Sequence, residues 1–167
     1  DILHSKGVEH LTVTDQGYAA IGPINWVAFN TKREPTSDVR VRQAIAYAID
    51  RNFLVDALTQ GTARPAYTGI HPDSIFNESD VARYDLDIDK ANAILDEAGY
   101  PRDSDGIRFP LTIDYGWPSA KPWAEYTKPQ LKKIGIDVTV RTSAGFPAWA
   151  KTVSNWEFDM TVDVVFN

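Results

Sequence analysis

Helical spacing of apolar residues marks three segments in the first part of the chain. The clearest stripe repeats at i, i+3, i+4, i+7 and i+8 after a capping aspartate, Asp38. It consists of Val41, Ala44, Ile45, Ala48 and Ile49. We expect this stripe to be buried in the core. Helices are also predicted over residues 50–61 and 87–99, because each segment begins with an aspartate and ends with a glycine.

Four segments show the apolar patterns of β-strands. Residues 24–30 are apolar at nearly every position, as in a strand covered on both faces, so Trp26 is expected to be buried. In the other three segments apolar and polar residues alternate. These segments span residues 109–115, 136–141 and 158–164. A helix predicted over residues 119–134 joins the first two of them into a βαβ unit, which makes those two strands parallel. A short helix is predicted over residues 146–153.

The fold class that these elements predict is α/β, with a mixed sheet flanked by helices. Residues 23–167 are expected to form one domain, whereas residues 1–22 are weakly patterned and suggest only a short strand near Leu11 and Val13. Residues 62–86 are predicted to form an ordered loop, because large side chains can hold it against the core. These side chains belong to Tyr67, Ile70, Ile75, Phe76 and Tyr84.

Composition fits one globular domain and argues against several classes of function. Apolar residues make up 43% and charged residues 24% of the 167 residues, close to the globular average. The net charge of −6, with no basic run longer than Lys132-Lys133, argues against nucleic acid or an anionic membrane surface as a partner. The chain has no cysteine, so disulfides, thiolate metal sites and a cysteine nucleophile are excluded.

Export signals and membrane spans are not evident in the sequence. No stretch approaches the roughly 20 apolar residues that a membrane-spanning helix needs. The first residues, Asp1 to His4, have neither the basic region nor the apolar run of a signal peptide. If the protein is exported, we expect its signal peptide to lie upstream of this chain.

No motif in the sequence points to catalysis or to a metal. The three histidines, His4, His10 and His71, have no ligand spacing, and a surface histidine is much commoner than a metal ligand. The sequence contains neither a nucleophile elbow nor a phosphate-binding loop. Asp159 and Asp163 share one face of the last predicted strand, where a solvated strand face is favoured over an acid–base pair. We therefore expect no enzyme activity, no cofactor and no metal site.

One segment, residues 115–123, has the composition of a binding loop. It leaves the carboxyl end of a predicted parallel strand and leads into a helix, and open α/β sheets bind ligands at such ends. Trp117 and Trp123 can offer stacking surfaces, and Lys121 can offer a positive charge. The alternative is a loop whose tryptophans cap the core, and the residues alone leave both interpretations open.

Four different motifs follow one another along the chain. The first and most specific is FNTKREPTSDVRVRQAIAYAIDR, residues 29–51. The others lie in residues 89–100, 131–138 and 157–160. Together they resemble the signature of the family-5 extracellular solute-binding proteins, which serve oligopeptide, dipeptide and nickel ABC importers. The resemblance extends over residues 23–166, and four motifs in register make it highly specific.

This resemblance implies one lobe of a type II periplasmic-binding-protein fold. Members of the family have two lobes that close on a ligand about a hinge. The chain is similar to most of the second, C-terminal lobe, and we expect it to stop short of that lobe's final return crossing. The implied function is non-covalent capture of a peptide or peptide-like solute for an ABC permease in the membrane. The implied protein is a monomer, and it is periplasmic, or extracellular and lipid-anchored.

Ligand contacts are also implied by the resemblance. The loop with Trp117, Lys121 and Trp123 falls where family members approach the ligand, which favours the binding interpretation of that loop. A second contact region is expected near the hinge, where the resemblance implies that the last three residues line the cleft. These residues are Val165, Phe166 and Asn167.

The end of the chain departs from the pattern of the peptide-binding members. A Gly-Trp pair commonly stands there before an acid that pairs with the amino terminus of the peptide, and this chain has Val164-Val165 instead. The fold is also used in ligand-sensing modules of transcriptional regulators, which is the alternative function. A signal peptide or lipobox upstream would support transport, and a helix-turn-helix upstream would support regulation.

Overall fold

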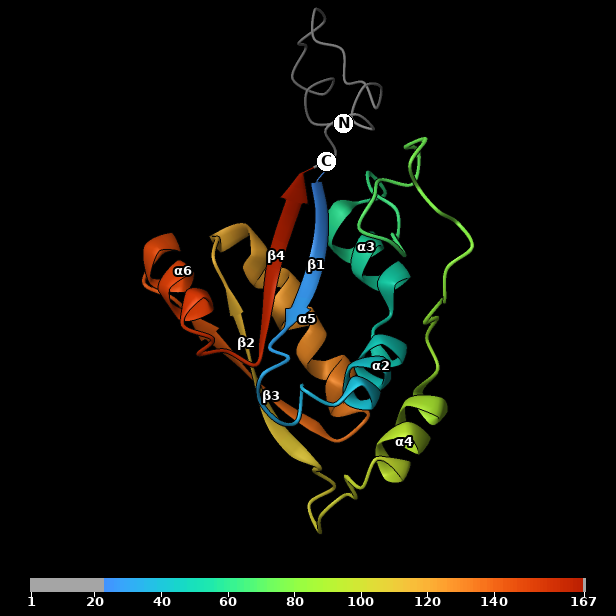
Figure 1. Ribbon diagram of the computed structural model, residues 1–167, viewed down its shortest axis with the longest axis vertical. Coiled ribbons are helices and arrows are strands. Elements are labelled where there is room, and N and C mark those ends of the chain that lie inside the picture. The colour runs from blue at the N-terminus through green and yellow to red at the C-terminus, as the bar shows by residue number, and fades with distance from the viewer. Residues whose placement is uncertain (1–22, 167) are drawn as a thin grey trace, which may run out of the picture.

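The computed structural model describes residues 23–166, and for Val165 and Phe166 it describes the backbone alone. These residues form a mixed four-stranded sheet with helices on both faces (Figure 1). The strands are β1 (Pro23–Phe29), β2 (Phe109–Tyr115), β3 (Ile136–Thr142) and β4 (Met160–Phe166). The helices are α2 (Val39–Ala48), α3 (Arg51–Thr59), α4 (Ile88–Glu97), the 3-10 helix η2 (Pro118–Ala120), α5 (Lys121–Lys132) and α6 (Phe146–Ser154). Within the described range, each helix is too short or too polar to cross a membrane.

Sheet order is β1-β4-β2-β3. β2 pairs in parallel with β3 on one side and with β4 on the other, whereas β1 pairs antiparallel with β4. The predicted parallel pairing of the two strands that flank α5 is therefore confirmed. The carboxyl ends of β2, β3 and β4 and the amino end of β1 consequently lie together, and we call this the carboxyl end of the sheet.

Core residues occupy the face of the sheet that α5 covers. The strands contribute Leu111, Ile113, Ile136, Val138, Met160 and Val162, each at most 2% exposed. The predicted stripe of α2 is confirmed, because Val41, Ala44 and Ile45 are fully buried and belong to the same cluster. A stripe at helical spacing therefore packs against strands whose side chains alternate in and out of the core.

Three helices begin where the sequence predicts, because an aspartate caps each of them. The carboxylates of Asp38, Asp50 and Asp87 accept hydrogen bonds from backbone N–H groups of the first turn, at 2.8, 2.9 and 2.8 Å. Beyond the end of α4, Gly99 has a φ of 88°, the left-handed conformation that commonly follows a helix.

Trp26 corrects one expectation, because 46% of its surface is exposed. β1 is an edge strand, and its register places Trp26 opposite Asp163. Side chains of a strand alternate between its faces, and Val27 and Phe29 are the neighbours that pack against the core. The prediction of burial is therefore wrong: this strand has one core face, and its run of apolar residues does not reflect cover on both faces.

The long loop over residues 62–86 is held at fewer points than expected. Tyr84 packs edge-on against Tyr47 of α2, with ring centroids 5.1 Å apart. Ile75 and Phe76, however, are 91% and 80% exposed, so they do not pin the loop to the core. Backbone hydrogen bonds close a tight turn around these two residues and direct them outward. The short strand predicted near residues 11–13 lies outside the described residues.

Candidate functional site

The loops that follow β2 and β3 lie side by side at the carboxyl end of the sheet. The parallel register pairs Tyr115, the last residue of β2, with Thr142, the last residue of β3. The hydroxyl groups of these two residues also form a hydrogen bond of 2.8 Å. Residues that follow the two strands are thereby brought close together although they are far apart in sequence, as expected for loops after parallel strands.

An aromatic cluster has formed where these loops meet, and it consists of Trp117, Phe146 and Trp149. The Trp117 and Phe146 rings stack, with centroids 4.5 Å apart and planes 15° apart. Trp149 lies 5.4 Å from Phe146 and 6.5 Å from Trp117. Trp117 remains 39% exposed and Phe146 43% exposed, whereas Trp149 is 7% exposed. The cluster therefore presents two aromatic rings to solvent over a buried third ring.

Trp149 is held at the base of the cluster by close contacts. Its indole N–H donates a hydrogen bond of 2.8 Å to the hydroxyl of Thr161 on β4. The six-membered part of its ring lies against the backbone of Gly116, where a Cβ atom would come within 2.8 Å of Trp149 Cδ2. Only glycine permits this approach without a shift of the ring or the loop.

Lys121 and Trp123 both lie in α5, after η2 has turned the chain. Lys121 is the first residue of α5 and its side chain is exposed. A positive charge at the amino-terminal end of a helix is unfavourable with respect to the helix dipole, so an anionic group bound nearby would relieve it. Trp123 is half-buried and packs against the core cluster. Of the three residues predicted in this loop, Trp117 and Lys121 thus face solvent most openly.

Two of the three residues predicted near the hinge, Val165 and Phe166, lie at the end of β4. The backbone of Val165 pairs with Ile24 and that of Phe166 pairs with Pro23, which places both at the carboxyl end of the sheet. Asn167 lies outside the described residues. The structure thus brings the backbone of Val165 and Phe166 to the same end of the sheet as Trp117.

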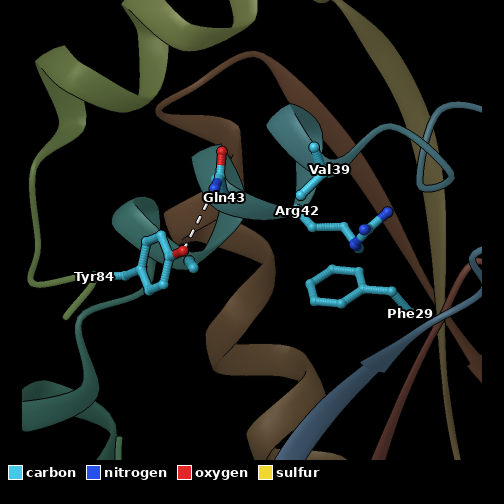
Figure 2. A pocket seen from close by; sticks show the side chains of 6 residues that line it. Phe29, Val39, Arg42, Gln43 and Tyr84 are labelled. Carbon is cyan, nitrogen blue, oxygen red and sulfur yellow. Dashed lines mark hydrogen bonds between the residues drawn. The ribbon is translucent and has the colours of Figure 1, made fainter. Parts of the chain in front are cut away.

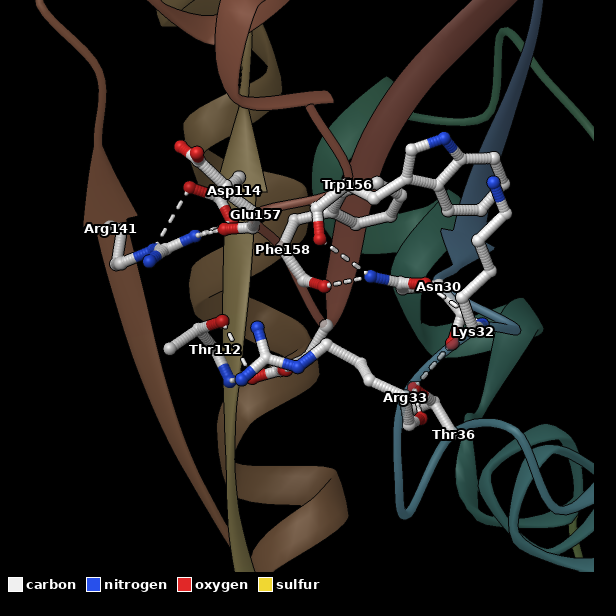
Figure 3. A network of polar contacts seen from close by, with 11 residues as sticks. Asn30, Lys32, Arg33, Thr36, Thr112, Asp114, Arg141, Trp156, Glu157 and Phe158 are labelled. Atoms are coloured by element: carbon white, nitrogen blue, oxygen red, sulfur yellow. Dashed lines mark hydrogen bonds and ion pairs between the residues drawn. The ribbon is translucent and has the colours of Figure 1, made fainter. Parts of the chain in front are cut away.

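A polar network occupies the sheet face opposite the core (Figure 3). Asp114 is 2% exposed, and its carboxylate accepts two hydrogen bonds from the Arg141 guanidinium at 3.0 and 2.7 Å. Arg141 also donates to the Glu157 carbonyl at 2.8 Å. Burial raises the pKa of Asp114 although Arg141 opposes this shift, and the hydrogen bond to Asp114 raises the pKa of Arg141. The pair joins β2 and β3 to the segment after α6.

Asp159 belongs to the same network, so its interpretation as part of a solvated strand face is wrong. Its Oδ2 atom accepts hydrogen bonds from the backbone N–H and the hydroxyl of Thr112, at 2.8 and 2.7 Å. Its other oxygen lies 3.4 Å from Nε of Arg33. Buried Asn30 donates to two backbone carbonyls in the turn before β4, at 2.9 and 2.8 Å. These contacts fix the turn and give Asp159 a structural role.

An open hollow of about 240 Å³ lies between β1 and α2 (Figure 2). Its lining consists of Phe29, Val39, Arg42, Gln43, Ala46 and Tyr84. Arg42 donates to the carbonyls of Thr36 and Ser37 at 2.8 Å each, so its Nη1 group already has partners. Phe29, the last residue of β1, packs against the core cluster, so the hollow lies on the core face of the sheet, whereas Trp149 of the aromatic cluster bonds Thr161 on the other face.

A metal centre has no candidate in residues 23–166, because no three histidine, aspartate or glutamate side chains there are grouped suitably. Three residues in and beneath the aromatic cluster are not among the site residues that the sequence predicts. They are Phe146, Trp149 and Thr161. Phe146 and Trp149 stand at i and i+3 of α6, a pattern that indicates a core-facing helix as readily as a binding surface. Their position after the carboxyl end of β3 is the signal that could have identified them.

Comparison with protein families gives one extensive match. A family profile described as bacterial extracellular solute-binding proteins, family 5 Middle, matches residues 6–166. The chain is 31% identical to the dipeptide-binding protein of Escherichia coli over 121 residues, which covers 71% of this chain and 22% of that protein. It is 33% identical to heme-binding protein A of Haemophilus influenzae over 115 residues, which covers 68% of this chain and 21% of that protein. The chain thus spans about a fifth of these relatives.

Solved structures show the same arrangement of elements. The periplasmic binding protein DppA from Helicobacter pylori, in complex with the peptide STSA, superposes with a TM-score of 0.79 at 25% identity. The match covers 89% of this chain and 28% of that chain. The sheet and helices described above therefore have the fold of a lobe of a type II periplasmic binding protein, as the sequence predicted.

Proposed function

Because this chain belongs to the family-5 bacterial extracellular solute-binding proteins, we propose that it forms most of the C-terminal lobe of a protein that captures a peptide or peptide-like solute for an ABC importer. The relatives are named for binding a dipeptide or heme, and a solved relative holds the tetrapeptide STSA. The proposal takes its ligand class from the peptide-binding members. It places the protein in the periplasm, or outside the cell on a lipid anchor.

The observation that carries this proposal is the aromatic cluster at the carboxyl end of the sheet. Trp117 and Phe146 are stacked and exposed there, and Lys121 stands exposed at the start of the following helix. In this proposal the rings stack against an apolar or planar part of the ligand, and Lys121 attracts an anionic part such as a peptide carboxylate. In this proposal Trp123 supports the aromatic cluster from α5. Val165, Phe166 and Asn167 contribute further ligand contacts near the hinge.

Capture follows a shift between two conformations in this proposal. The other lobe would close over a ligand seated on the aromatic cluster, and ligand bound to both lobes would stabilise the closed form. The ABC permease would then recognise that closed form. The protein would act as a monomer without contacting nucleic acid. A ligand-sensing module of a transcriptional regulator fits less well, because the family profile that matches residues 6–166 describes extracellular proteins.

Ligand class is tested by purifying the full-length protein and identifying what it carries. Mass spectrometry under native conditions should show the mass of the protein with its bound ligand, and mass spectrometry after denaturation should show a free peptide. Isothermal titration with the tetrapeptide Ser-Thr-Ser-Ala and with dialanine should then give saturable binding to the emptied protein. Heme serves as the contrasting ligand. Saturable binding of heme alone, with no response to either peptide, would contradict the proposed ligand class.

A further inference from the structure

Thr161 is a buried hydroxyl that joins three elements beneath the aromatic cluster. It lies on β4 and is 2% exposed. Its oxygen accepts the 2.8 Å hydrogen bond from the Trp149 indole of α6, and its hydroxyl donates to the Asp114 carbonyl of β2 at 3.2 Å. The hydroxyl acts as donor and acceptor at once, so its orientation and that of the indole are both specified.

The backbone of Gly116 lies close against the same indole. A Cβ atom at this position would lie 2.8 Å from Cδ2 and 2.9 Å from Cε3 of Trp149, far inside an ordinary contact. The ring is therefore flush with the backbone that links β2 to Trp117. Thr161 fixes the polar edge of the indole, and Gly116 leaves room for its face.

Fixing Trp149 also fixes the exposed part of the cluster. Phe146 precedes Trp149 by three residues on α6, so the two side chains share one face of that helix. Phe146 is in turn the ring on which Trp117 stacks at 4.5 Å. The Trp149 ring lies 5.4 Å from Phe146 and 6.5 Å from Trp117, so the position of the indole bears on both exposed rings.

We infer that Thr161 and Gly116 are positioning residues, which lock Trp149 and thereby set the geometry of the Trp117–Phe146 surface that receives the ligand. This inference rests on the proposed function for its consequence in binding. Neither residue needs to touch the ligand. We call this fixed position of the Trp149 indole the lock. It is a property of the protein without ligand and can be measured separately from binding.

Four substitutions in the full-length protein test the lock. Thr161→Val keeps the shape of the side chain and removes the hydroxyl, whereas Thr161→Ser keeps the hydroxyl. Gly116→Ala leaves the hydroxyl in place and obstructs the ring. The matched control is Thr36→Val, since Thr36 is fully buried and its hydroxyl donates to the Asn30 carbonyl at 2.7 Å near the end of β1, away from the cluster.

Two spectroscopic readouts report on the lock directly. The first is hydrogen exchange of the Trp149 indole N–H, assigned by its disappearance in Trp149→Phe. Loss of the bond should accelerate this exchange roughly tenfold in Thr161→Val, the factor that corresponds to a typical hydrogen bond. The second is near-ultraviolet circular dichroism, which senses fixed aromatic packing and should weaken in both Thr161→Val and Gly116→Ala.

The outcomes separate the lock from simple stabilisation. Thr161→Ser should keep the slow indole exchange and the near-ultraviolet dichroism of the unaltered protein. Thr36→Val should lower the melting temperature while leaving the exchange and the dichroism unchanged. Unchanged indole exchange and dichroism in Thr161→Val and Gly116→Ala would overturn the inference, as would failure of Thr161→Ser to restore them. If Thr161→Val does not fold, Gly116→Ala and Thr161→Ser still decide the question.

Binding provides the consequence. The affinity for Ser-Thr-Ser-Ala, measured by titration, should fall roughly fivefold to tenfold in Thr161→Val and stay within about twofold in Thr161→Ser. Peptide affinity that stays unchanged in Thr161→Val while the spectroscopic signals are lost would overturn the positioning role. If the unaltered protein does not bind the peptide, the proposed function fails, and the spectroscopic comparison still tests the lock alone.

Discussion

Trp117 and Trp156 expose similar fractions of their surfaces, 39% and 41%, but only Trp117 belongs to the aromatic cluster. Trp117 follows the carboxyl end of β2 and stacks on Phe146. Trp156 precedes the amino end of β4 and lies under the ammonium group of Lys32, 3.8 Å from its ring centroid. The two tryptophans therefore form a matched pair for separating ligand binding from general effects of losing a surface ring.

Substitution of Trp117 by alanine should weaken ligand binding by roughly 1–3 kcal/mol, the usual loss for an aromatic anchor in an interface. The melting temperature should barely move, because the ring is partly solvated already. Isothermal titration and thermal melts of the full-length protein measure both effects. Trp156→Ala, the control, should leave affinity unchanged. If Trp117→Ala strongly lowers the melting temperature but leaves the ligand affinity of the folded protein unchanged, the ring is a cap on the core and not a ligand contact.

Sequence patterns predict the position of Trp117 in the fold, but they do not predict the exposure of Trp26. Trp117 was marked because it follows a strand, and the structure places it at the carboxyl end of the sheet. Trp26 was expected to be buried, but burial depends on which strands become edges, and that is decided by pairing with a distant segment. Trp149 and Thr161 were missed because their hydrogen bond joins two elements whose contact no local spacing reveals.

Asp114 gives the chain a stability term that depends on pH. Burial raises its pKa above the ordinary value of 3.8, so the folded chain binds the proton more tightly than the unfolded chain. This contribution to the free energy of unfolding is complete below the unfolded pKa and is lost as pH rises through the folded pKa. Denaturant melts of the unaltered chain and of Asp114→Asn, which cannot titrate there, should show a stability difference that declines with rising pH. A difference that grows with pH would contradict the raised pKa.

At the scale of elements, helix α2 was predicted most completely, because its cap and its stripe are both local. Asp38 begins the helix, and the stripe at helical spacing becomes its buried face. The parallel β2–α5–β3 unit is also predictable from local patterns, because a strand, a helix and a strand that are consecutive in sequence form a crossover between parallel strands. The loop over residues 62–86 was predicted less well, because hydrogen bonds that turn Ile75 and Phe76 outward follow no periodic pattern.

Ile45→Ala should lower the free energy of unfolding by about 2–5 kcal/mol, because Ile45 is fully buried and the shortened side chain leaves a cavity. Val39→Ala in the same helix is the control, since Val39 is 52% exposed and should change stability by no more than about 0.5 kcal/mol. Denaturant melts compare the two variants. Equal losses would show that the buried face of α2 has been assigned wrongly.

At the scale of the whole molecule, the fold class and the parallel part of the sheet were predictable, whereas the complete strand order was not. β1 and β4 pair across most of the chain length, and nothing in their separate patterns specifies that they are neighbours or antiparallel. Family resemblance supplied that context in the form of a lobe, and the match over residues 6–166 agrees with it. The chain spans about a fifth of the relatives, so a ligand held between lobes would touch only part of its binding surface here.

This chain alone should therefore bind Ser-Thr-Ser-Ala at least about tenfold more weakly than the full-length protein, a difference of about 1.4 kcal/mol or more. The physical reason is that a peptide bound to this chain alone cannot touch the other lobe. Parallel titrations measure the two affinities, after circular dichroism has shown that the isolated chain is folded. Equal affinities would contradict capture between two lobes.

The central claim, that a peptide is received on the aromatic cluster, is tested most directly by nuclear magnetic resonance of the tryptophan indole N–H groups. Titration of the nitrogen-15-labelled full-length protein with Ser-Thr-Ser-Ala reports on each assigned ring separately. We predict that the resonances of Trp117 and Trp149 shift and saturate with the bound fraction, while that of Trp156 stays in place. A saturating shift of Trp156, with Trp117 and Trp149 unmoved, would contradict the account.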